Sequence, residues 1–155
     1  MPKIYPRRKN HHLSVSVYNN TGLFFITICT HNRTPFFGRI IDDRLSPTPY
    51  GILMTELIKK YSFLYPGIRI QQFVIMPNHI HFLIYRQQIN TNPQISLHEF
   101  INQLKGQASK KCGISLWQRG YYDHIIRTED DMRMVMEYFQ NNPRKWTLDR
   151  EYVGN

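Results

Sequence analysis

Residues 68–86 read IRIQQFVIMPNHIHFLIYR, and this stretch decides the fold. Two runs rich in β-branched and aromatic residues, 68–76 and 79–86, flank a Pro-Asn dipeptide that is typical of a tight turn. The stretch therefore predicts a β-hairpin. Because side chains alternate along a strand, we expect His79 and His81 on one face of the sheet. The apolar side chains between and after them should face the helices on the other side.

The rest of the chain alternates strand-like and helical patterns around this hairpin. Runs of β-branched and aromatic residues indicate strands, and apolar residues spaced three and four apart indicate helices. The proline-containing segment 33–50 is expected to be a loop. The remaining predicted elements are a buried strand over 23–30, a helix over 51–64, a helix that begins with a capping box of Ser96 and Glu99 and ends at Gly113, a strand over 117–127 broken near Gly120, and a last helix from Thr128 to Pro143.

This order of elements predicts an α+β fold. Its first six elements, β-α-β-β-α-β, match the ferredoxin-like split β-α-β pattern with an antiparallel sheet. The seventh element is an extra C-terminal helix, which carries Tyr138. We expect a single domain over residues 21–155, preceded by a basic N-terminal arm over residues 1–20.

The charge balance favours a polyanionic partner. The chain has 155 residues, and 20 Lys and Arg against 11 Asp and Glu give it a formal net charge of +9. Nucleic acid is the first expectation and an anionic membrane surface the second. No apolar run is long enough to predict a membrane span, and no signal peptide is visible. Two cysteines, Cys29 and Cys112, do not make a disulfide framework, so we expect a cytoplasmic protein.

The histidine pair is the first candidate site. Two imidazoles on one face of a strand can chelate a divalent cation through neutral ring nitrogens, although His79 and His81 are also compatible with two ordinary half-exposed residues. On the last helix, Tyr138 and Asn142 are four residues apart and share a face. That face is offset from the apolar stripe of the helix. Tyr138 is therefore either directed toward the sheet or a boundary aromatic residue with its hydroxyl in water.

Four stretches of the sequence resemble the HUH endonucleases, which carry histidine, hydrophobic residue, histidine on a strand and a tyrosine on a late helix. More narrowly, the chain resembles the single-tyrosine HUH transposases, above all the REP-associated tyrosine transposases and their relatives with an IS200-like domain. The resemblance covers most of the chain. The matching stretches are GLFFITICTHNR (22–33), FVIMPNHIHFLI (73–84), LWQRGYYDHIIR (116–127) and EYFQNNPRKW (137–146), in the order and spacing of the family.

The resemblance implies a site and a reaction. His79 and His81 match the metal ligands of the family, and Tyr138 matches its nucleophile. Asn142 matches a glutamine or asparagine that can complete the metal shell. The implied cofactor is Mg²⁺ or Mn²⁺, which would polarise a scissile phosphate. The implied reaction is cleavage and rejoining of single-stranded DNA near hairpins through a 5′-phosphotyrosine intermediate.

The implied partner is single-stranded DNA that forms hairpins, which would place the protein with the nucleoid and away from membranes. The family resemblance leaves both a monomer and a homodimer open. Basic and polar side chains are candidate phosphate contacts, although a solvated helix face is the alternative explanation for the three lysines. The candidate DNA-binding residues are Arg7, Arg8, Lys9, Lys105, Lys110, Lys111, Arg119, His124 and Arg127.

Three functions remain compatible with the sequence. The first is an active transposase that uses Tyr138, with Tyr121 and Tyr122 as rival nucleophiles by chemistry alone. The second is a domesticated sequence- or hairpin-specific DNA-binding protein with little or no cleavage activity. The third is an unrelated metal-dependent hydrolase or an RNA-binding ferredoxin-like domain, which would need exposed aromatic residues on its central strands.

Overall fold

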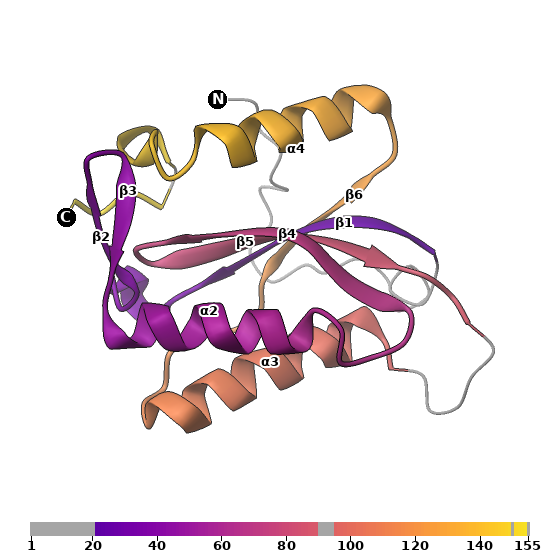
Figure 1. The fold of residues 1–155 in the computed structure, drawn as a ribbon, viewed down its shortest axis with the longest axis horizontal. Coiled ribbons are helices and arrows are strands. Elements are labelled where there is room, and N and C mark those ends of the chain that lie inside the picture. Colours follow the sequence, from indigo (N-terminus) through magenta and orange to yellow (C-terminus); the bar gives the residue numbers. More distant parts are fainter. Residues whose placement is uncertain (1–20, 90–94, 150, 155) are drawn as a thin grey trace.

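The computed structural model describes residues 21–89, 95–149 and 151–154, and their strands and helices form an α+β fold (Figure 1). Four strands make an antiparallel sheet in the order β4-β5-β1-β6. The predicted fold class and the predicted hairpin of β4 and β5 are confirmed. The four strands are β1 (Gly22–Cys29), β4 (Ile68–Met76), β5 (His79–Arg86) and β6 (Tyr122–Ile126).

Helices cover both faces of this sheet. Helices α2 (Pro49–Tyr61) and α3 (Leu97–Cys112) lie against one face, and α4 (Glu129–Asn141) lies against the other (Figure 1). Each helix begins at a side-chain cap, which satisfies backbone N–H groups of its first turn. The caps are Thr48 for α2, Ser96 with Glu99 for α3, and Thr128 for α4.

The alternation of side chains along β5 assigns its residues to two different environments. Ile80, Phe82 and Ile84 belong to the large apolar core beneath α2 and α3. Leu83 belongs to a smaller apolar cluster under α4, together with Phe25 of β1. His79 and His81 have the parity of Leu83, so they face α4, as the sequence predicts. The fold therefore places the histidine pair between the sheet and the last helix.

The prediction of a loop over 33–50 is wrong for its central part. Strands β2 (Gly38–Ile41) and β3 (Arg44–Pro47) form a separate two-stranded hairpin. Asp42 and Asp43, at its turn, have φ values of 50° and 62°. Two successive residues with positive φ are typical of the tight turn that joins two short strands, and aspartate tolerates this conformation better than most residues.

Other element boundaries shift by a few residues. The predicted strand over 117–127 is shorter, because only Tyr122–Ile126 pair with β1, and Trp117 makes an isolated bridge to Thr30. Short 3-10 turns lie at His31–Arg33 (η1) and Trp146–Leu148 (η2). Among the described residues, no helix is long and apolar enough to cross a membrane.

Candidate active site

His79 begins β5, and its imidazole is fully buried. Its Nδ1 lies 2.7 Å from Oδ1 of Asn78. The Asn78 amide nitrogen donates to the carbonyls of Glu151 and Arg33, so its oxygen faces the histidine as an acceptor. His79 must therefore donate from Nδ1, and in its neutral form Nε2 carries the lone pair. This is the tautomer in which Nε2 can bind a metal ion.

His81 lies two residues further along β5 and is also fully buried. Its Nδ1 is 2.7 Å from the hydroxyl of Thr27, which is its direct neighbour across the sheet on β1. A hydroxyl both donates and accepts, so Thr27 supports either neutral tautomer. Burial lowers the pKa of His81 to about 4 although its hydrogen bond with Asp149 acts in the opposite direction. His81 is therefore neutral at physiological pH, as a metal ligand must be.

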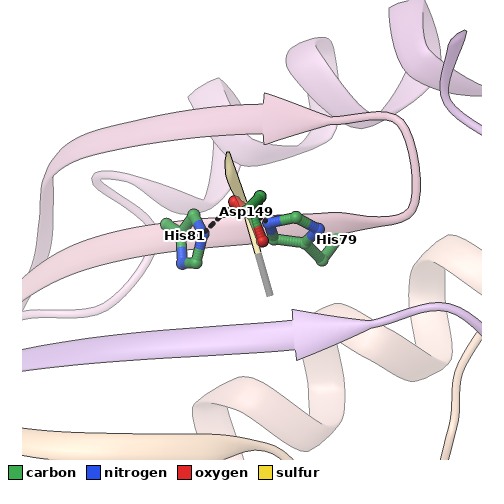
Figure 2. Close-up of side chains that lie close together, drawn as sticks. All are labelled: His79, His81 and Asp149. Atoms are coloured by element: carbon green, nitrogen blue, oxygen red, sulfur yellow. Dashed lines mark hydrogen bonds and ion pairs between the residues drawn. The ribbon is translucent and has the colours of Figure 1, made fainter. Parts of the chain in front are cut away.

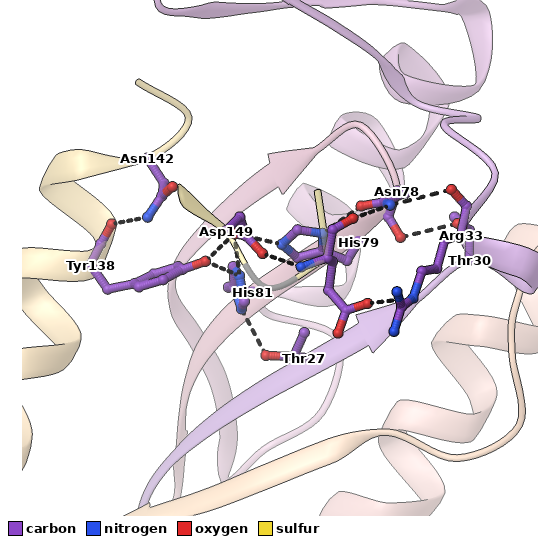
Figure 3. A network of polar contacts seen from close by, with 10 residues as sticks. Thr27, Thr30, Arg33, Asn78, His79, His81, Tyr138, Asn142 and Asp149 are labelled. Atoms are coloured by element: carbon purple, nitrogen blue, oxygen red, sulfur yellow. Dashed lines mark hydrogen bonds and ion pairs between the residues drawn. The ribbon is translucent and has the colours of Figure 1, made fainter. Parts of the chain in front are cut away.

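Tyr138 projects from α4 toward the sheet and meets the histidine pair (Figure 3). Its hydroxyl oxygen lies 2.7 Å from Nε2 of His81, and the two rings meet edge to face. The hydroxyl also donates a hydrogen bond to Asp149. Only 5% of Tyr138 is exposed, so its ring is not a boundary aromatic with its hydroxyl in water. The structure thus brings Tyr138 to the histidines.

Asp149 is the site residue that the sequence analysis missed. Its Oδ2 lies 3.2 Å from Nε2 of His79 and 3.9 Å from Nε2 of His81 (Figure 2). The chain reaches this position through η2, where the buried Trp146 packs 5.9 Å from the His79 ring between centroids. Its Oδ1 accepts a hydrogen bond from the backbone of Glu151, which holds the carboxylate in place. No local sequence pattern predicts this return of the chain.

The electrostatics of the group favour an ionised carboxylate. Burial raises the pKa of Asp149, but hydrogen bonds and charge interactions with His79 and His81 outweigh it and hold the pKa below its ordinary range. A carboxylate beside a neutral His81 is the protonation state in which both side chains are electron-pair donors.

His79, His81 and Asp149 could together hold a metal ion. One ligand atom from each lies within 4.8 Å of the others, and all three residues are buried. Nε2 of His79 and Oδ2 of Asp149 share a hydrogen bond of 3.2 Å, and a divalent cation could take the place of the proton between them. Two imidazoles and a carboxylate fit Mn²⁺ well, while Mg²⁺ prefers an all-oxygen shell.

Asn142, the fourth residue expected in the site, lies apart from this group. It ends α4, and its side-chain amide donates to the carbonyl of Tyr138 at 2.9 Å. Figure 3 shows this amide on the α4 side of Tyr138, away from the histidines. Asp149, and not Asn142, is the third donor that the structure places beside His79 and His81. A ligand role for Asn142 stays a prediction.

The three lysines expected to contact DNA belong to α3, on the face of the sheet opposite the histidines. Lys110 and Lys111 are exposed. Lys105 is buried, and its ammonium donates to the carbonyls of Gln118 and Gly120. Burial lowers its pKa to about 8. These contacts give Lys105 a structural function at the approach to β6.

The other candidate DNA contacts are spread around the molecule. His124 of β6 shares the face of the histidine pair, and its Nε2 lies 3.8 Å from Asp131 of α4. Arg127 is exposed, and its backbone N–H donates to Asp131. Arg119 is exposed in the turn before β6. Their contacts with DNA stay predictions, and the candidates Arg7, Arg8 and Lys9 lie outside the described residues.

The two rival tyrosines differ in their position relative to the site. Tyr121 belongs to the core beneath α3, where its hydroxyl lies 2.7 Å from Nδ1 of His98. Tyr122 faces α4 and is the direct neighbour of Thr27 on the side away from His81. Tyr138 is the tyrosine whose hydroxyl the structure shows in contact with His81 and Asp149.

The chain is similar in sequence to known proteins. An uncharacterised protein of Haemophilus influenzae is 34% identical to this chain over 158 residues, which is 88% of each. The REP-associated tyrosine transposase of Escherichia coli K12 is 26% identical over 129 residues, or 83% of this chain and 70% of that protein.

A solved structure has the same fold. It is a REP-associated tyrosine transposase bound to a REP hairpin, with a TM-score of 0.66 and 21% identity, over 92% of this chain and 77% of that one. The model of the family "Transposase IS200 like" matches residues 23–142, the part of the chain that contains His79, His81 and Tyr138. The chain therefore belongs to the IS200-like transposase family.

Proposed function

We propose that this protein is a metal-dependent single-stranded DNA nicking and joining enzyme, a transposase that cleaves near DNA hairpins. The contact that carries the proposal is the 2.7 Å approach of the Tyr138 hydroxyl to Nε2 of His81. A potential nucleophile thus lies within one hydrogen bond of a group that could hold a metal ion. This is the arrangement that phosphodiester cleavage by a tyrosine requires.

His79, His81 and Asp149 would hold the divalent cation, Mg²⁺ or Mn²⁺, and Asn142 remains a further candidate ligand. Bound there, the cation would polarise the scissile phosphate and offset the charge that develops on it. Thr27 and Asn78 keep the two imidazoles oriented through their Nδ1 atoms. Burial of the group under α4 strengthens each of these electrostatic interactions relative to water.

In the cleavage step, Oη of Tyr138 forms a bond to phosphorus and the bond between phosphorus and O3′ breaks. The phenolic proton leaves Oη, and O3′ takes up a proton as the free 3′-OH. The downstream strand stays on Tyr138 as a 5′-phosphotyrosine. Because the phosphoester is conserved, attack by a second 3′-OH on the same phosphorus reverses the step and joins two strands.

Asp149 holds the Tyr138 hydroxyl but is a weak base. A phenol has an ordinary pKa of about 10 and an aspartate one of about 4, so proton transfer between them costs about 8 kcal/mol. The histidines lower the pKa of Asp149 further, which increases this cost. Asp149 therefore orients the hydroxyl, and the charge of the divalent cation is what would stabilise the phenolate.

Recognition of DNA hairpins is supported by the relatives. The solved structure of similar fold is described as bound to a REP hairpin, and the Escherichia coli relative is a REP-associated tyrosine transposase. The net charge of +9 suits a nucleic-acid partner. All the residues that we propose for cleavage meet within one chain, so a monomer suffices for the chemistry and a homodimer is a further possibility for strand exchange.

A covalent-adduct assay tests the proposal. The protein is mixed with Mn²⁺ and labelled hairpin-forming single strands from the flanks of its own gene, and a denaturing gel separates protein-linked DNA. We expect a slower band that Tyr138→Phe and His79→Ala abolish. Tyr122→Phe is the matched control, because it removes a neighbouring hydroxyl on the same face of the sheet and should keep the band.

Two other results would contradict the proposal. An adduct that survives Tyr138→Phe and disappears with Tyr122→Phe would move the nucleophile to β6. Hairpin binding without any adduct would favour a DNA-binding protein without cleavage activity.

A further inference from the structure

Arg33, at the end of η1, forms an ion pair next to the candidate active site. Its Nε lies 3.1 Å from Oε2 of Glu151. The Glu151 side chain is 5% exposed and the Arg33 side chain is 54% exposed. A carboxylate that is buried to this extent needs a cationic or hydrogen-bonding partner, and Arg33 provides one. The arginine keeps about half of its surface open to solvent.

The loop that presents Arg33 has an uncommon conformation. Asn32 and Arg33 have φ values of 54° and 55°, in the left-handed region that residues with a side chain disfavour. The amide nitrogen of Asn78 donates to the carbonyl of Arg33 and holds this conformation. Such local strain persists only where the surroundings determine it, and it is concentrated at functional sites.

Asn78 connects this loop with the histidine pair. Its amide nitrogen bonds to the carbonyls of Arg33 and Glu151, and its amide oxygen accepts from Nδ1 of His79 (Figure 3). The backbone of Asn78 is fixed as well, because its carbonyl accepts the Thr30 hydroxyl at 3.0 Å. The positions of the Arg33 backbone and the His79 ring therefore depend on one side chain.

The segment that follows η2 places one carboxylate beside the histidine pair and a second carboxylate beside Arg33. Asp149 lies against His79, His81 and Tyr138, and Glu151 lies against Arg33. Two carboxylates two residues apart in the sequence thus contact two neighbouring polar positions, the histidine pair and Arg33. A nucleic-acid strand carries such anions in a regular series, and the planar fork of an arginine matches the oxygens of a phosphate.

We propose that Arg33 binds a backbone phosphate of the single strand, next to the phosphate that Tyr138 attacks. Glu151 lies at this phosphate position in the structure, so Glu151 and the strand exclude each other there. Arg33 is then a substrate-positioning residue, fixed relative to His79 by Asn78. The inference rests on the proposed function, because it takes single-stranded DNA as the substrate.

The test measures dissociation constants for a hairpin-forming strand that extends across the cleavage position. Two further strands each carry one neutral methylphosphonate. In one strand it replaces the phosphate on the 5′ side of the scissile phosphate, and in the other it replaces the phosphate on the 3′ side. We expect Arg33→Gln to weaken binding of the unmodified strand about tenfold or more, which is the effect of one charge-assisted hydrogen bond. It should cause no further loss on the methylphosphonate strand that lacks its partner. Arg33→Lys should recover part of the affinity.

Two matched variants separate a lost contact from lost charge or lost folding. Arg133→Gln also removes one positive charge, from an exposed pair with Asp130 on α4, and should change the affinity little. Arg33→Gln combined with Glu151→Gln removes the whole ion pair, so no buried carboxylate is left unpaired. The double variant should bind DNA as weakly as Arg33→Gln, and Glu151→Gln alone should bind more tightly than the wild type.

Different failures identify which claim is wrong. If Arg33→Gln binds every strand as Arg133→Gln does while the wild type still forms the covalent adduct, the inference is overturned and the proposed function stands. If the Arg33→Gln loss is equal on all three strands, the neighbouring phosphate is not its partner and the inference is overturned. If the wild type binds none of the strands, both claims fail.

Discussion

The hydroxyl of Tyr138 donates a hydrogen bond to the carboxylate of Asp149, eleven residues later in the chain. The same carboxylate oxygen lies 3.2 Å from Nε2 of His79. This relationship joins the candidate nucleophile to the candidate metal ligands through a residue that belongs to neither the hairpin nor α4. It also makes the position of Asp149 the feature that distinguishes the structure from the site expected from the sequence.

The first prediction concerns the third metal ligand. Asp149→Asn removes the carboxylate charge and should weaken Mn²⁺ binding at least about tenfold, because charged oxygen ligands dominate the attraction of a divalent cation. Asn142→Ala should weaken Mn²⁺ binding less than Asp149→Asn does, since the Asn142 amide bonds to the Tyr138 carbonyl. Isothermal titration calorimetry with Mn²⁺ compares the two. The opposite order would assign the third ligand to Asn142, as the sequence analysis expected.

The second prediction concerns Thr27, which contacts His81 Nδ1 at 2.7 Å. Thr27→Val keeps the shape of the side chain and removes the hydroxyl, so His81 loses the partner that orients its ring. The loss of such a partner typically lowers metal affinity 10- to 100-fold. Thr55→Val is the matched control, since the Thr55 hydroxyl donates to the carbonyl of Gly51 within α2, on the opposite face of the sheet. Equal Mn²⁺ affinities of the two variants would show that Thr27 does not orient His81.

The third prediction is a loss of stability in acid. The pKa of His81 is about 4 in the folded protein against an ordinary 6.5, so below pH 6.5 the unfolded chain binds the proton first. Stability should therefore fall by about 2 kcal/mol between pH 7 and pH 5. Asp149, the acidic group facing His81, has a lowered pKa and stays ionised in this range.

Urea unfolding at the two pH values measures this loss without added metal. His81→Gln has no proton to bind at this position and should lose about 2 kcal/mol less than the wild type over the same range. His98→Gln, which removes a histidine from the opposite face of the sheet, is the matched control variant. An unchanged pH dependence in His81→Gln would show that His81 is not the responsible group.

The fourth prediction concerns packing of α2 against the β2–β3 hairpin. A Cβ at Gly51 would lie 2.2 Å from the carbonyl oxygen of Phe37, so Gly51→Ala should destabilise the protein by about 1–3 kcal/mol. At Gly106, in α3, a Cβ would meet nothing within 4 Å. Gly106→Ala should therefore stabilise the protein by about 0.5–1 kcal/mol, as expected for an exposed helix position. Thermal unfolding of both variants measures the difference, and the same sign for both would contradict the packing.

Features with a local sequence pattern were predicted correctly. The alternation in β5 and the Pro-Asn turn before it determine which face of the sheet His79 and His81 occupy, and this does not depend on contacts with distant segments. The three helices follow from apolar spacing and capping residues, and the structure confirms them within a few residues of their bounds. The predicted offset between Tyr138 and the apolar stripe of α4 is wrong, because Tyr138 lies on the buried face of the helix with Val135 and Phe139.

The missed features depend on contacts between distant segments. Asp149 reaches His79 because Trp146 anchors the chain after α4, and nothing in the spacing of residues 143–151 indicates that return. The β2–β3 hairpin was missed because its strands have four residues each and its turn has two aspartates instead of the more typical Asn-Gly or Asp-Gly. Lys105 is predicted as a DNA contact, with a solvated helix face as the alternative, but the chain at Gln118 and Gly120 accepts hydrogen bonds from its buried ammonium.

The central claim is that Tyr138 becomes covalently linked to DNA, and peptide mapping of the adduct tests it most directly. The wild-type protein is incubated with Mn²⁺ and a hairpin-forming strand, digested with nuclease and protease, and analysed by mass spectrometry. The account predicts a nucleotide attached through its 5′-phosphate to the peptide that contains Tyr138. The same modification on a peptide containing Tyr121 or Tyr122, or a link through a 3′-phosphate, would contradict it.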